Sequence, residues 1–272
     1  MVLFPATLSE LIASSWRHRQ LIVSLARREV AGRYHGSVLG ILWALVLPIF
    51  MLAVYTFVFS VVFKARWSEA STSRTEFALT LFAGLLVFNL FSECFNRAPA
   101  LILHNQNYVK KVLFPLEILP WISLFAALFH AVMSYFVWQL AFILFMGWPP
   151  STFVLFPFVM IPFILFTLGV SWLLAALAVY VRDIAQVVGV MTSILMFMSP
   201  IFYPMSALPP TYQKLIGLNP LAFPIELARD VLLWGKVPDE SSFTLYAVVS
   251  SLVAWGGFAC FQKLRSGFAD VV

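Results

Sequence analysis

One uncharged stretch of sequence decides the class of fold: VLGILWALVLPIFMLAVYTFVFSVVF, residues 38–63. A transmembrane helix needs about 20 predominantly apolar residues to cross a hydrocarbon core about 30 Å thick, and this stretch has 26. The whole chain has the same character, since 62% of its 272 residues are hydrophobic and 11% are charged, where an average soluble domain has about 25% charged residues. We therefore predict an integral membrane protein, and the composition excludes a cytosolic enzyme and a nucleic-acid-binding domain.

Five further apolar stretches are long enough to cross a membrane, which gives an all-α fold with six predicted transmembrane helices. They are residues 77–96, 121–146, 152–181, 184–202 and 243–261. Pro48 lies inside the first span. We expect it to kink that helix, because proline removes one backbone hydrogen bond and clashes with the preceding turn.

The distribution of basic residues predicts the orientation of these helices. With the N-terminus inside, the inner segments carry Arg17, Arg19, Arg27, Arg28, Arg33, Arg97, Lys110, Lys111, Arg182, Lys263 and Arg265. The outer segments carry the smaller set of Lys64, Arg66, Arg74, Lys214, Arg229 and Lys236. Because the side richer in Lys and Arg is cytoplasmic, we predict that both termini lie in the cytoplasm.

Residues 1–37 form a region of their own ahead of the first span. Within it, residues 7–35 predict an amphipathic helix, because apolar residues recur at helical spacing beside arginines. Such a helix lies along the membrane interface with its arginines toward the lipid headgroups, and Thr7 or Ser9 is suited to cap its start. The pattern fits a plain membrane anchor and equally a surface that contacts a partner protein.

The segment between the fifth and sixth spans is broken by prolines. They are Pro200, Pro204, Pro209, Pro210, Pro220, Pro224 and Pro238, and apolar residues lie between them. Short re-entrant helices at the outer face fit this pattern, since irregular backbone at membrane depth must be buried in protein or line a water-filled cavity. A cap on the outer surface is the alternative.

Few ionisable residues lie inside the predicted spans. Glu93 and Arg97 are four residues apart and are spaced to form an ion pair, and Asn89 extends the same polar stripe. The stripe predicts either hydrogen bonds that hold the helices together or part of a substrate path. His130 stands alone in its span, so we expect it to be packed and neutral.

The sequence contains no nucleotide-binding motif. The phosphate-binding pattern GxxxxGK[ST] does not occur, and the two halves show no inverted repeat of the kind found in gradient-driven carriers. A transporter without an energy source of its own must use an ion gradient or borrow an ATPase, and borrowing requires a cytoplasmic element that receives the movement of the ATPase. Residues 105–115, NQNYVKKVLFP, offer one to two helical turns with polar, basic and aromatic side chains; a solvated connecting loop is the alternative.

Several short motifs, taken in their order along the chain, form a further pattern. They are Arg28-Glu29-Val30, RYHGSVLGILW at 33–43 with Pro48, NYVKKVLFPLEILP at 107–120, Arg182-Asp183-Ile184, SPIFYP at 199–204, and Leu218-Asn219-Pro220-Leu221. Together they resemble the ABC exporter permeases for polysaccharides, the family of O-antigen, capsule and teichoic-acid export permeases. The run at 33–43 is more similar to the O-antigen and teichoic-acid permeases than to the capsule branch.

This resemblance implies a transport subunit, not an enzyme, that works as a homodimer with two separate ABC ATPase subunits in a bacterial inner membrane. ATP and Mg²⁺ would bind the ATPase, and this chain would hold no cofactor. The implied substrate is an undecaprenyl-linked polysaccharide, and lipopolysaccharide O-antigen is the predicted cargo. The alternatives are teichoic acid, capsule, a drug or a lipid, and a membrane-embedded transferase is a third class of function.

The resemblance also assigns roles to residues. Contact with the ATPase is assigned to Asn107, Tyr108, Lys110, Lys111, Arg182 and Asp183, and the substrate entrance to Arg28, Arg33 and Tyr34. Residues 38–272 would form the transmembrane domain, with 105–115 as its coupling segment and 199–240 as its periplasmic gate segment.

Aromatic residues give candidates for a channel lining. The chain has 28 Phe, 9 Trp and 8 Tyr, and sugar rings pack their C–H faces on aromatic planes, so an aromatic surface suits a sliding polymer. The candidates are Tyr55 and Phe59 on the first span and Phe197, Phe202 and Tyr203 at the end of the fifth. For each of them, packing against lipid or neighbouring helices is the alternative, because apolar and aromatic side chains are common on lipid-facing surfaces.

Overall fold

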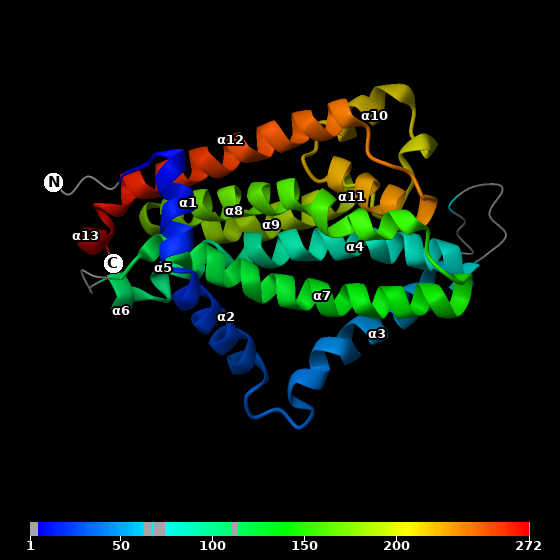
Figure 1. The fold of residues 1–272 in the computed structure, drawn as a ribbon, viewed down its shortest axis with the longest axis horizontal. Helices are drawn as coiled ribbons and strands as arrows, with labels where there is room; N and C mark the ends of the chain where they lie inside the picture. The colour runs from blue at the N-terminus through cyan, green and yellow to red at the C-terminus, as the bar shows by residue number, and fades with distance from the viewer. Residues whose placement is uncertain (1–4, 63–66, 68–73, 110–113, 272) are drawn as a thin grey trace.

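The computed structural model describes residues 5–62, 67, 74–109 and 114–271, and within them every regular element is helical. Figure 1 shows a bundle in which α4, α7, α8, α9 and α12 run along the long axis, while α2 and α3 diverge from it as the two arms of a V. The long helices are α3 (Trp43–Tyr55, continued by the π-helix η2, Thr56–Val62), α4 (Arg74–Arg97), α7 (Leu119–Met146), α8 (Phe156–Tyr180), α9 (Ile184–Met198) and α12 (Glu240–Arg265).

Shorter helices gather at the two ends of the bundle. Near the chain termini lie α1 (Leu8–Arg17), α2 (Arg19–Tyr34), α5 (Ala100–Leu103), α6 (Gln106–Val109) and α13 (Phe268–Val271). At the opposite end lie α10 (Pro210–Gly217), α11 (Ala222–Arg229) and the π-helix η6 (Asp230–Trp234). The 3₁₀ turns η1 (Gly40–Leu42), η3 (Leu116–Ile118), η4 (Ser151–Leu155) and η5 (Met205–Ala207) join these elements.

Among the described residues, five helical stretches are long and apolar enough to span a membrane. They are Gly40–Phe59, Thr75–Arg97, Leu116–Met146, Ser151–Tyr180 and Glu240–Arg265. The predicted span 184–202 is shorter than expected, because α9 has 15 residues and ends at Met198, which gives it a length of about 22 Å. Ser199 is extended, with ψ at 148°, because the residue before a proline is driven out of the helical region.

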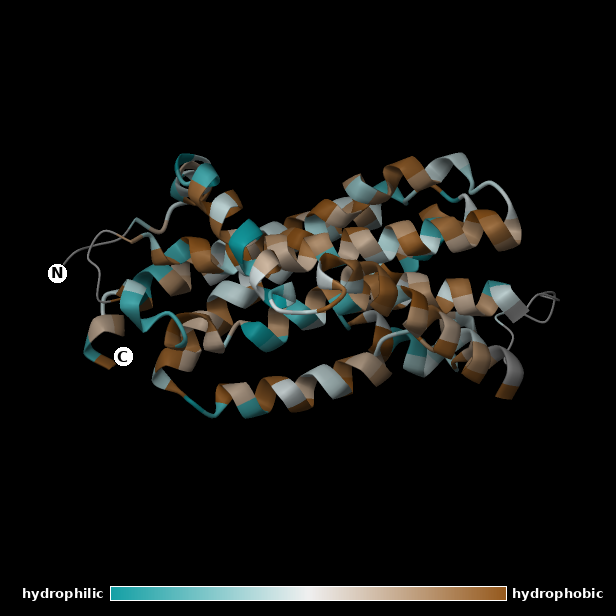
Figure 2. Cartoon of the chain, turned by 90° about the horizontal axis from the view of Figure 1, so that it is seen from below, coloured by the Kyte–Doolittle hydropathy of each residue, from teal (hydrophilic) through white to brown (hydrophobic). Residues whose placement is uncertain are grey.

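The long helices differ sharply in how much of their surface the chain itself covers. In the most apolar part of each span, 83% of the α4 residues are buried but only 6% of the α3 residues. The buried core therefore lies between α4, α7 and α8, with Phe163, Trp138 and Trp172 among its largest side chains. Figure 2 shows hydrophobic residues on the outward faces of the long helices as well. This is the pattern of a surface that faces lipid or another apolar partner.

The amphipathic segment is not one helix, as the sequence pattern predicted, but two. It breaks at His18, whose φ of −100° and ψ of 12° end α1 and begin α2 in a new direction. Thr7 caps α1 as predicted, since the Glu10 amide donates to its Oγ1 at 3.3 Å. Figure 1 shows α1 lying across the long helices close to the end that holds both termini.

The helices α8 and α12 meet at two glycines. A Cβ atom on Gly257 would lie 2.0 Å from the Gly169 carbonyl oxygen, and one on Gly169 would lie 2.5 Å from the Val253 carbonyl oxygen. No side chain fits there, so the two backbones are in direct contact. Small residues at such crossings let apolar helices pack closely. This packing stabilises helix association in lipid, where the hydrophobic effect does not drive it.

Replacing Gly257 with alanine should therefore push α12 away from α8 and lower the free energy of unfolding by about 1–3 kcal/mol, the usual cost of overpacking. The matched control is Gly256→Ala, because a Cβ at Gly256 meets nothing within 4 Å. The measurement is the thermal unfolding midpoint of both variants in the same detergent. Equal midpoints for the two variants would contradict the packing described here.

Candidate functional site

Arg229 is a fully buried cation at the end of the bundle opposite the termini. Its side chain is 1% exposed, and it donates hydrogen bonds to three backbone carbonyls, those of Thr80 (3.1 Å), Ile201 (2.8 Å) and Pro200. It also pairs with Glu226 one helical turn earlier, at 2.9 Å. These bonds join α11 to α4 and to the chain that follows α9.

The glycine at position 84 makes room for this arginine. A Cβ on Gly84 would lie 2.7 Å from Nη2 of Arg229, so a larger residue there would displace the guanidinium. The indole of Trp67 lies against the guanidinium, with its ring centroid 4.3 Å from the Arg229 Cζ. An arginine is suited to this position because its planar fork presents five N–H donors in fixed directions.

Next to Arg229 begins a continuous row of aromatic rings, which we call the aromatic row: Trp67, Phe77, Phe59, Phe202 and Phe197. Successive ring centroids are 5.6, 5.6, 5.9 and 6.0 Å apart. These separations are typical of favourable aromatic pairs. The row runs from buried Phe77 to Phe197, which is 65% exposed, and therefore leads from the core to the surface.

Three of the five predicted channel-lining residues, Phe59, Phe197 and Phe202, lie together in the aromatic row. Tyr203 lies beside it, because its hydroxyl donates to the Phe197 carbonyl at 3.4 Å. Tyr55 is half-buried and packs against the core, outside the row. Phe77 and Trp67 were not among the predicted lining residues, since neither is close to the other rings of the row along the chain.

A second site is a charged cluster formed by Glu29 and Arg33 of α2, Glu93 and Arg97 of α4, and His130 of α7. Arg33 pairs with Glu93 and Arg97 pairs with Glu29 between the two helices. The predicted Glu93–Arg97 pair is present at 3.8 Å. Burial raises the pKa of Glu29 above its usual value, although Arg33 acts to lower it. The polar stripe on α4 thus attaches α2, the second helix of the amphipathic segment, to the bundle.

The neutral state of His130 stays a prediction, and the structure adds hydrogen-bond partners that the sequence did not indicate. Its Nδ1 lies 3.0 Å from Glu93 Oε2 and 2.9 Å from Arg33 Nη1, and its Nε2 lies 2.9 Å from the Tyr34 hydroxyl. Arg33 and Tyr34 come from α2, almost a hundred residues earlier in the chain, and Glu93 comes from α4, so the pattern within α7 gave no signal for them. Arg33 and Tyr34, predicted at the substrate entrance, are therefore joined in one hydrogen-bonded group.

The predicted coupling segment lies at the same end of the bundle as the termini. Tyr108 of α6 stacks on Phe114 with ring centroids 4.2 Å apart. Arg28 and Tyr108 line one small cavity of about 180 Å³ between α2, α6 and α7.

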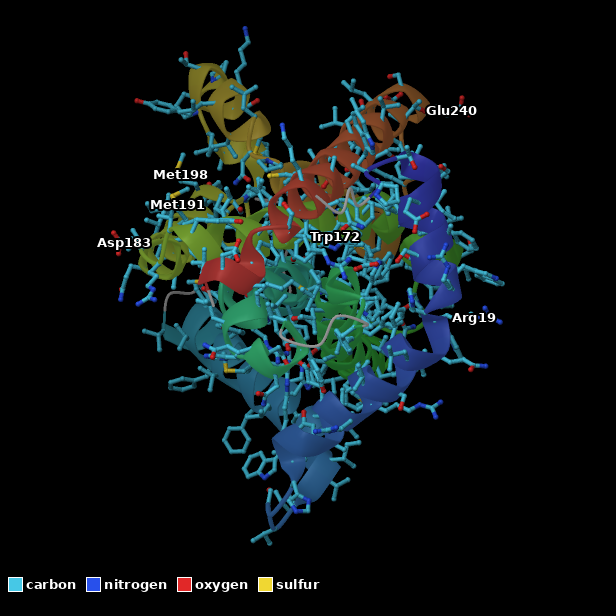
Figure 3. All side chains as sticks on the ribbon, turned by 90° about the vertical axis from the view of Figure 1, so that its left-hand side faces the viewer. Arg19, Trp172, Asp183, Met191, Met198 and Glu240 are labelled. Atoms are coloured by element: carbon cyan, nitrogen blue, oxygen red, sulfur yellow. The ribbon has the colours of Figure 1, made fainter. Side chains whose placement is uncertain are left out.

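Asn107 lies in α6 and is exposed, whereas Lys110 and Lys111 lie outside the described residues. Arg182 and Asp183 are exposed in the turn between α8 and α9, where Figure 3 labels Asp183.

A buried ion pair next to this segment was missed by the sequence analysis. Glu117 accepts a hydrogen bond from Arg265 at the end of α12, at 2.5 Å, and another from Ser14 of α1, at 3.0 Å. Arg265 also donates to the Phe114 carbonyl at 3.0 Å. The only signal in the sequence was the charge of Glu117 between apolar residues, which predicts a partner without identifying it.

Within the described residues, no group of three His, Cys, Asp or Glu side chains could hold a metal ion.

The fold and these sites define a class: a helical membrane protein with an aromatic row at one end and a charged, exposed surface at the other. The sequence profile of the ABC-2 type transporter family matches residues 20–233. The chain belongs to this family.

Curated relatives resemble the chain over nearly its whole length. The O-antigen export system permease protein RfbA of Myxococcus xanthus is 28% identical, over 96% of this chain and 99% of the relative. A protein of the same name from Klebsiella pneumoniae is 26% identical, over 93% and 95%. The polysialic acid transport protein KpsM of Escherichia coli is 21% identical, over 89% and 92%.

We expect Arg229→Met to lower the free energy of unfolding by about 3 kcal/mol or more, because it leaves several buried carbonyl groups without a donor at about 1–3 kcal/mol each. The control is Lys236→Met, since Lys236 is 68% exposed and an exposed substitution usually changes stability by less than about 0.5 kcal/mol. Thermal unfolding in detergent measures both. If Arg229→Met melts no earlier than Lys236→Met, Arg229 does not hold this end of the bundle together.

Proposed function

We propose that this chain is the permease subunit of an exporter that moves undecaprenyl-linked polysaccharide, lipopolysaccharide O-antigen in particular, across a bacterial inner membrane. The observation that carries the proposal is the similarity to O-antigen export permeases over 93–96% of the chain. Family membership already makes the chain a membrane transport protein. The proposal adds the cargo, the direction and the partners.

The energy source in this proposal is a separate ABC ATPase, because the sequence lacks a phosphate-binding motif of its own. Its two copies would contact the cytoplasmic end of the bundle. Support comes from the exposed positions of Asn107, Arg182 and Asp183 at that end. Movement of the coupling segment would reach the spans through Glu117, which is bonded to both α1 and α12.

In the proposed homodimer, the second copy of the chain would cover the helices whose surfaces are exposed in a single copy. Ala44 is the only buried residue described in α3, and Val188 the only one in α9. A twofold dimer formed through such faces would enclose a path wider than one subunit can. In this arrangement both termini are cytoplasmic, α9 is the fifth of six crossings, and α10 and α11 form the periplasmic gate segment, with α11 re-entrant.

The aromatic row supplies a surface along which a sugar polymer can slide. Ring faces contact the C–H faces of sugars without requiring one hydrogen-bonding pattern, so successive sugars of different kinds are accepted. Phe59 lies in η2, which continues α3, Phe197 lies in α9 and Phe202 follows that helix. We assign these three members to the lining of the path.

Deleting the gene in its native bacterium should abolish surface O-antigen while lipid-linked polymer accumulates inside. Lipopolysaccharide gels and extraction of the carrier-linked polymer measure the two pools. Intact surface polysaccharide together with increased drug sensitivity would instead indicate an exporter of drugs or lipids. Loss of capsule or teichoic acid alone would reassign the cargo within the family.

The double substitution Lys110→Ala and Lys111→Ala should reduce the amount of ATPase that co-purifies with the chain and lower surface polysaccharide by at least about tenfold, since two cations are removed from the contact. The matched control is Lys214→Ala with Lys236→Ala, which removes two exposed cations at the other end of the bundle. Unchanged export after the first double substitution, or equal loss after the control, would contradict the assigned contact.

A further inference from the structure

The bend between α1 and α2 forms an apolar groove that no function described so far explains. The groove has a volume of about 400 Å³ and lies between the amphipathic segment and the helices α7 and α8. Its lining includes Trp16, Arg19 and Val23 from the amphipathic segment and Trp121 and Phe125 from α7. Its lining is almost entirely apolar, and Arg19 is the one charged side chain in it.

Arg19 is held at the opening of the groove by its neighbour. The guanidinium lies over the Trp16 ring, 4.7 Å from its centroid, and Nη1 donates to the Trp16 carbonyl at 2.9 Å. Figure 3 shows the Arg19 side chain pointing away from the bundle. A guanidinium carries five N–H donors, so this arrangement fixes its position while presenting further donors to the surroundings.

The position of the groove indicates what fills it. An amphipathic helix lying across a transmembrane bundle marks the boundary between headgroups and acyl chains, and α1 lies across the long helices in this way (Figure 1). Tryptophans such as Trp16 and Trp121 favour the same depth. The groove is therefore apolar where acyl chains reach and positively charged where headgroups lie.

We propose that this groove binds one anionic glycerophospholipid, with an acyl chain between α2 and α7 and its phosphate on Arg19. A zwitterionic lipid offers the same chain, but its own cation opposes the attraction between Arg19 and the phosphate. The expected preference for the anionic lipid is about fivefold, the ratio expected from one basic residue at a membrane surface. The bound lipid would hold the α1–α2 bend against α7, close to the bond between Ser14 and Glu117.

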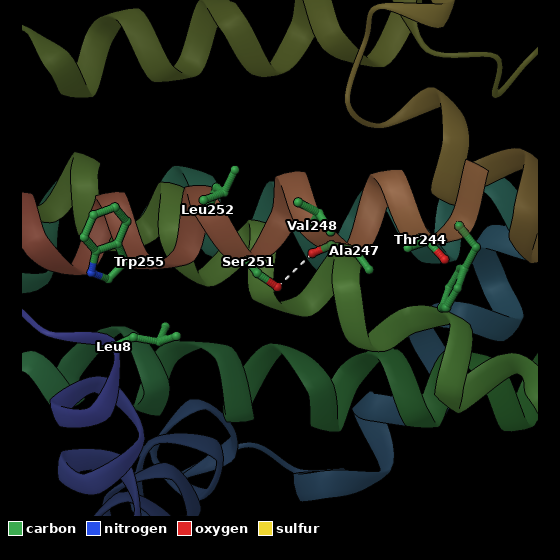
Figure 4. A pocket seen from close by; sticks show the side chains of 8 residues that line it. Leu8, Thr244, Ala247, Val248, Ser251, Leu252 and Trp255 are labelled. Carbon is green, nitrogen blue, oxygen red and sulfur yellow. Dashed lines mark hydrogen bonds between the residues drawn. The ribbon is translucent and has the colours of Figure 1, made fainter. Parts of the chain in front are cut away.

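A second groove provides a contrast within the same protein. It lies along α12 and is lined by Leu8 and by residues of that helix between Phe243 and Trp255 (Figure 4). Its volume is about 500 Å³, and none of these described residues is charged. Acyl chains can fill it, but it has no group with which to select a headgroup, so we assign no particular lipid to it.

Native mass spectrometry of the full-length chain tests the proposal. The purified protein is given equal amounts of phosphatidylglycerol and phosphatidylcholine of the same chain length, and the first lipid that remains bound is identified. We expect about five phosphatidylglycerol complexes for each phosphatidylcholine complex. The ratio should fall to about one in Arg19→Gln and stay at about five in Arg27→Gln, which removes an exposed arginine of α2 that does not line the groove.

A second variant tests whether lipid binding depends on the space in the groove or only on positive charge at the surface. Val23→Trp places a large side chain in the groove at a position that is 41% exposed, so the fold tolerates it. This substitution should reduce the amount of protein that retains one bound lipid, for phosphatidylglycerol and phosphatidylcholine alike, while Arg19 stays in place. The proposal is overturned if the native chain binds the two lipids in a ratio of about one. It is also overturned if the phosphatidylglycerol preference falls equally in Arg19→Gln and Arg27→Gln, or if Val23→Trp binds as much lipid as the native chain.

Discussion

The structure depends on one constraint, the need to satisfy backbone groups where helices break inside an apolar environment. Ser199 and Ile201 are fully buried in the protein, and a buried carbonyl that is left without a donor costs about 1–3 kcal/mol. After α9 the chain leaves the helical conformation at Ser199 because of Pro200. Arg229 supplies the donors for the carbonyls of Pro200 and Ile201, and it also bonds to α4. One side chain thereby fixes the position of α11 and of the end of α9.

The two ends of the bundle use polar groups in different ways. At one end, Arg229 makes its bonds mainly to backbone, and Trp67 of the aromatic row lies against its guanidinium. At the other, ion pairs join side chains of separate helices, as between Arg33 and Glu93 or between Glu117 and Arg265. The Glu117–Arg265 pair is nearly buried, and such pairs are weak evidence for stability but are costly to break. They are suited to holding the amphipathic helices and the coupling segment in one arrangement relative to the spans.

Much of the fold could be predicted from the sequence, because hydrophobic length is a strong local signal. The first, second, third, fourth and sixth spans were placed to within a few residues of the helices in the structure. The break at His18 could not be predicted, since the apolar pattern continues through it. The same holds for the partners of His130 and Glu117, which come from helices distant in sequence. The aromatic row was partly identified, because Phe59 and Phe202 could be placed by span whereas Trp67 could not. The roles assigned to Asn107, Lys110 and Arg182 remain predictions.

The proposed topology depends most on α9 crossing the membrane with its 15 residues, because that crossing would put the gate segment and the amphipathic helices on opposite sides. Cysteine labelling measures this directly: a chain without Cys94 and Cys260 receives one cysteine at Gln20, Leu218 or Ser266, and intact spheroplasts are treated with a membrane-impermeant maleimide. All three positions are exposed. We predict labelling of Leu218→Cys in intact spheroplasts, and of Gln20→Cys and Ser266→Cys only after the membrane is permeabilised. Labelling of Leu218→Cys only after permeabilisation would place it on the same side as Gln20 and contradict the account.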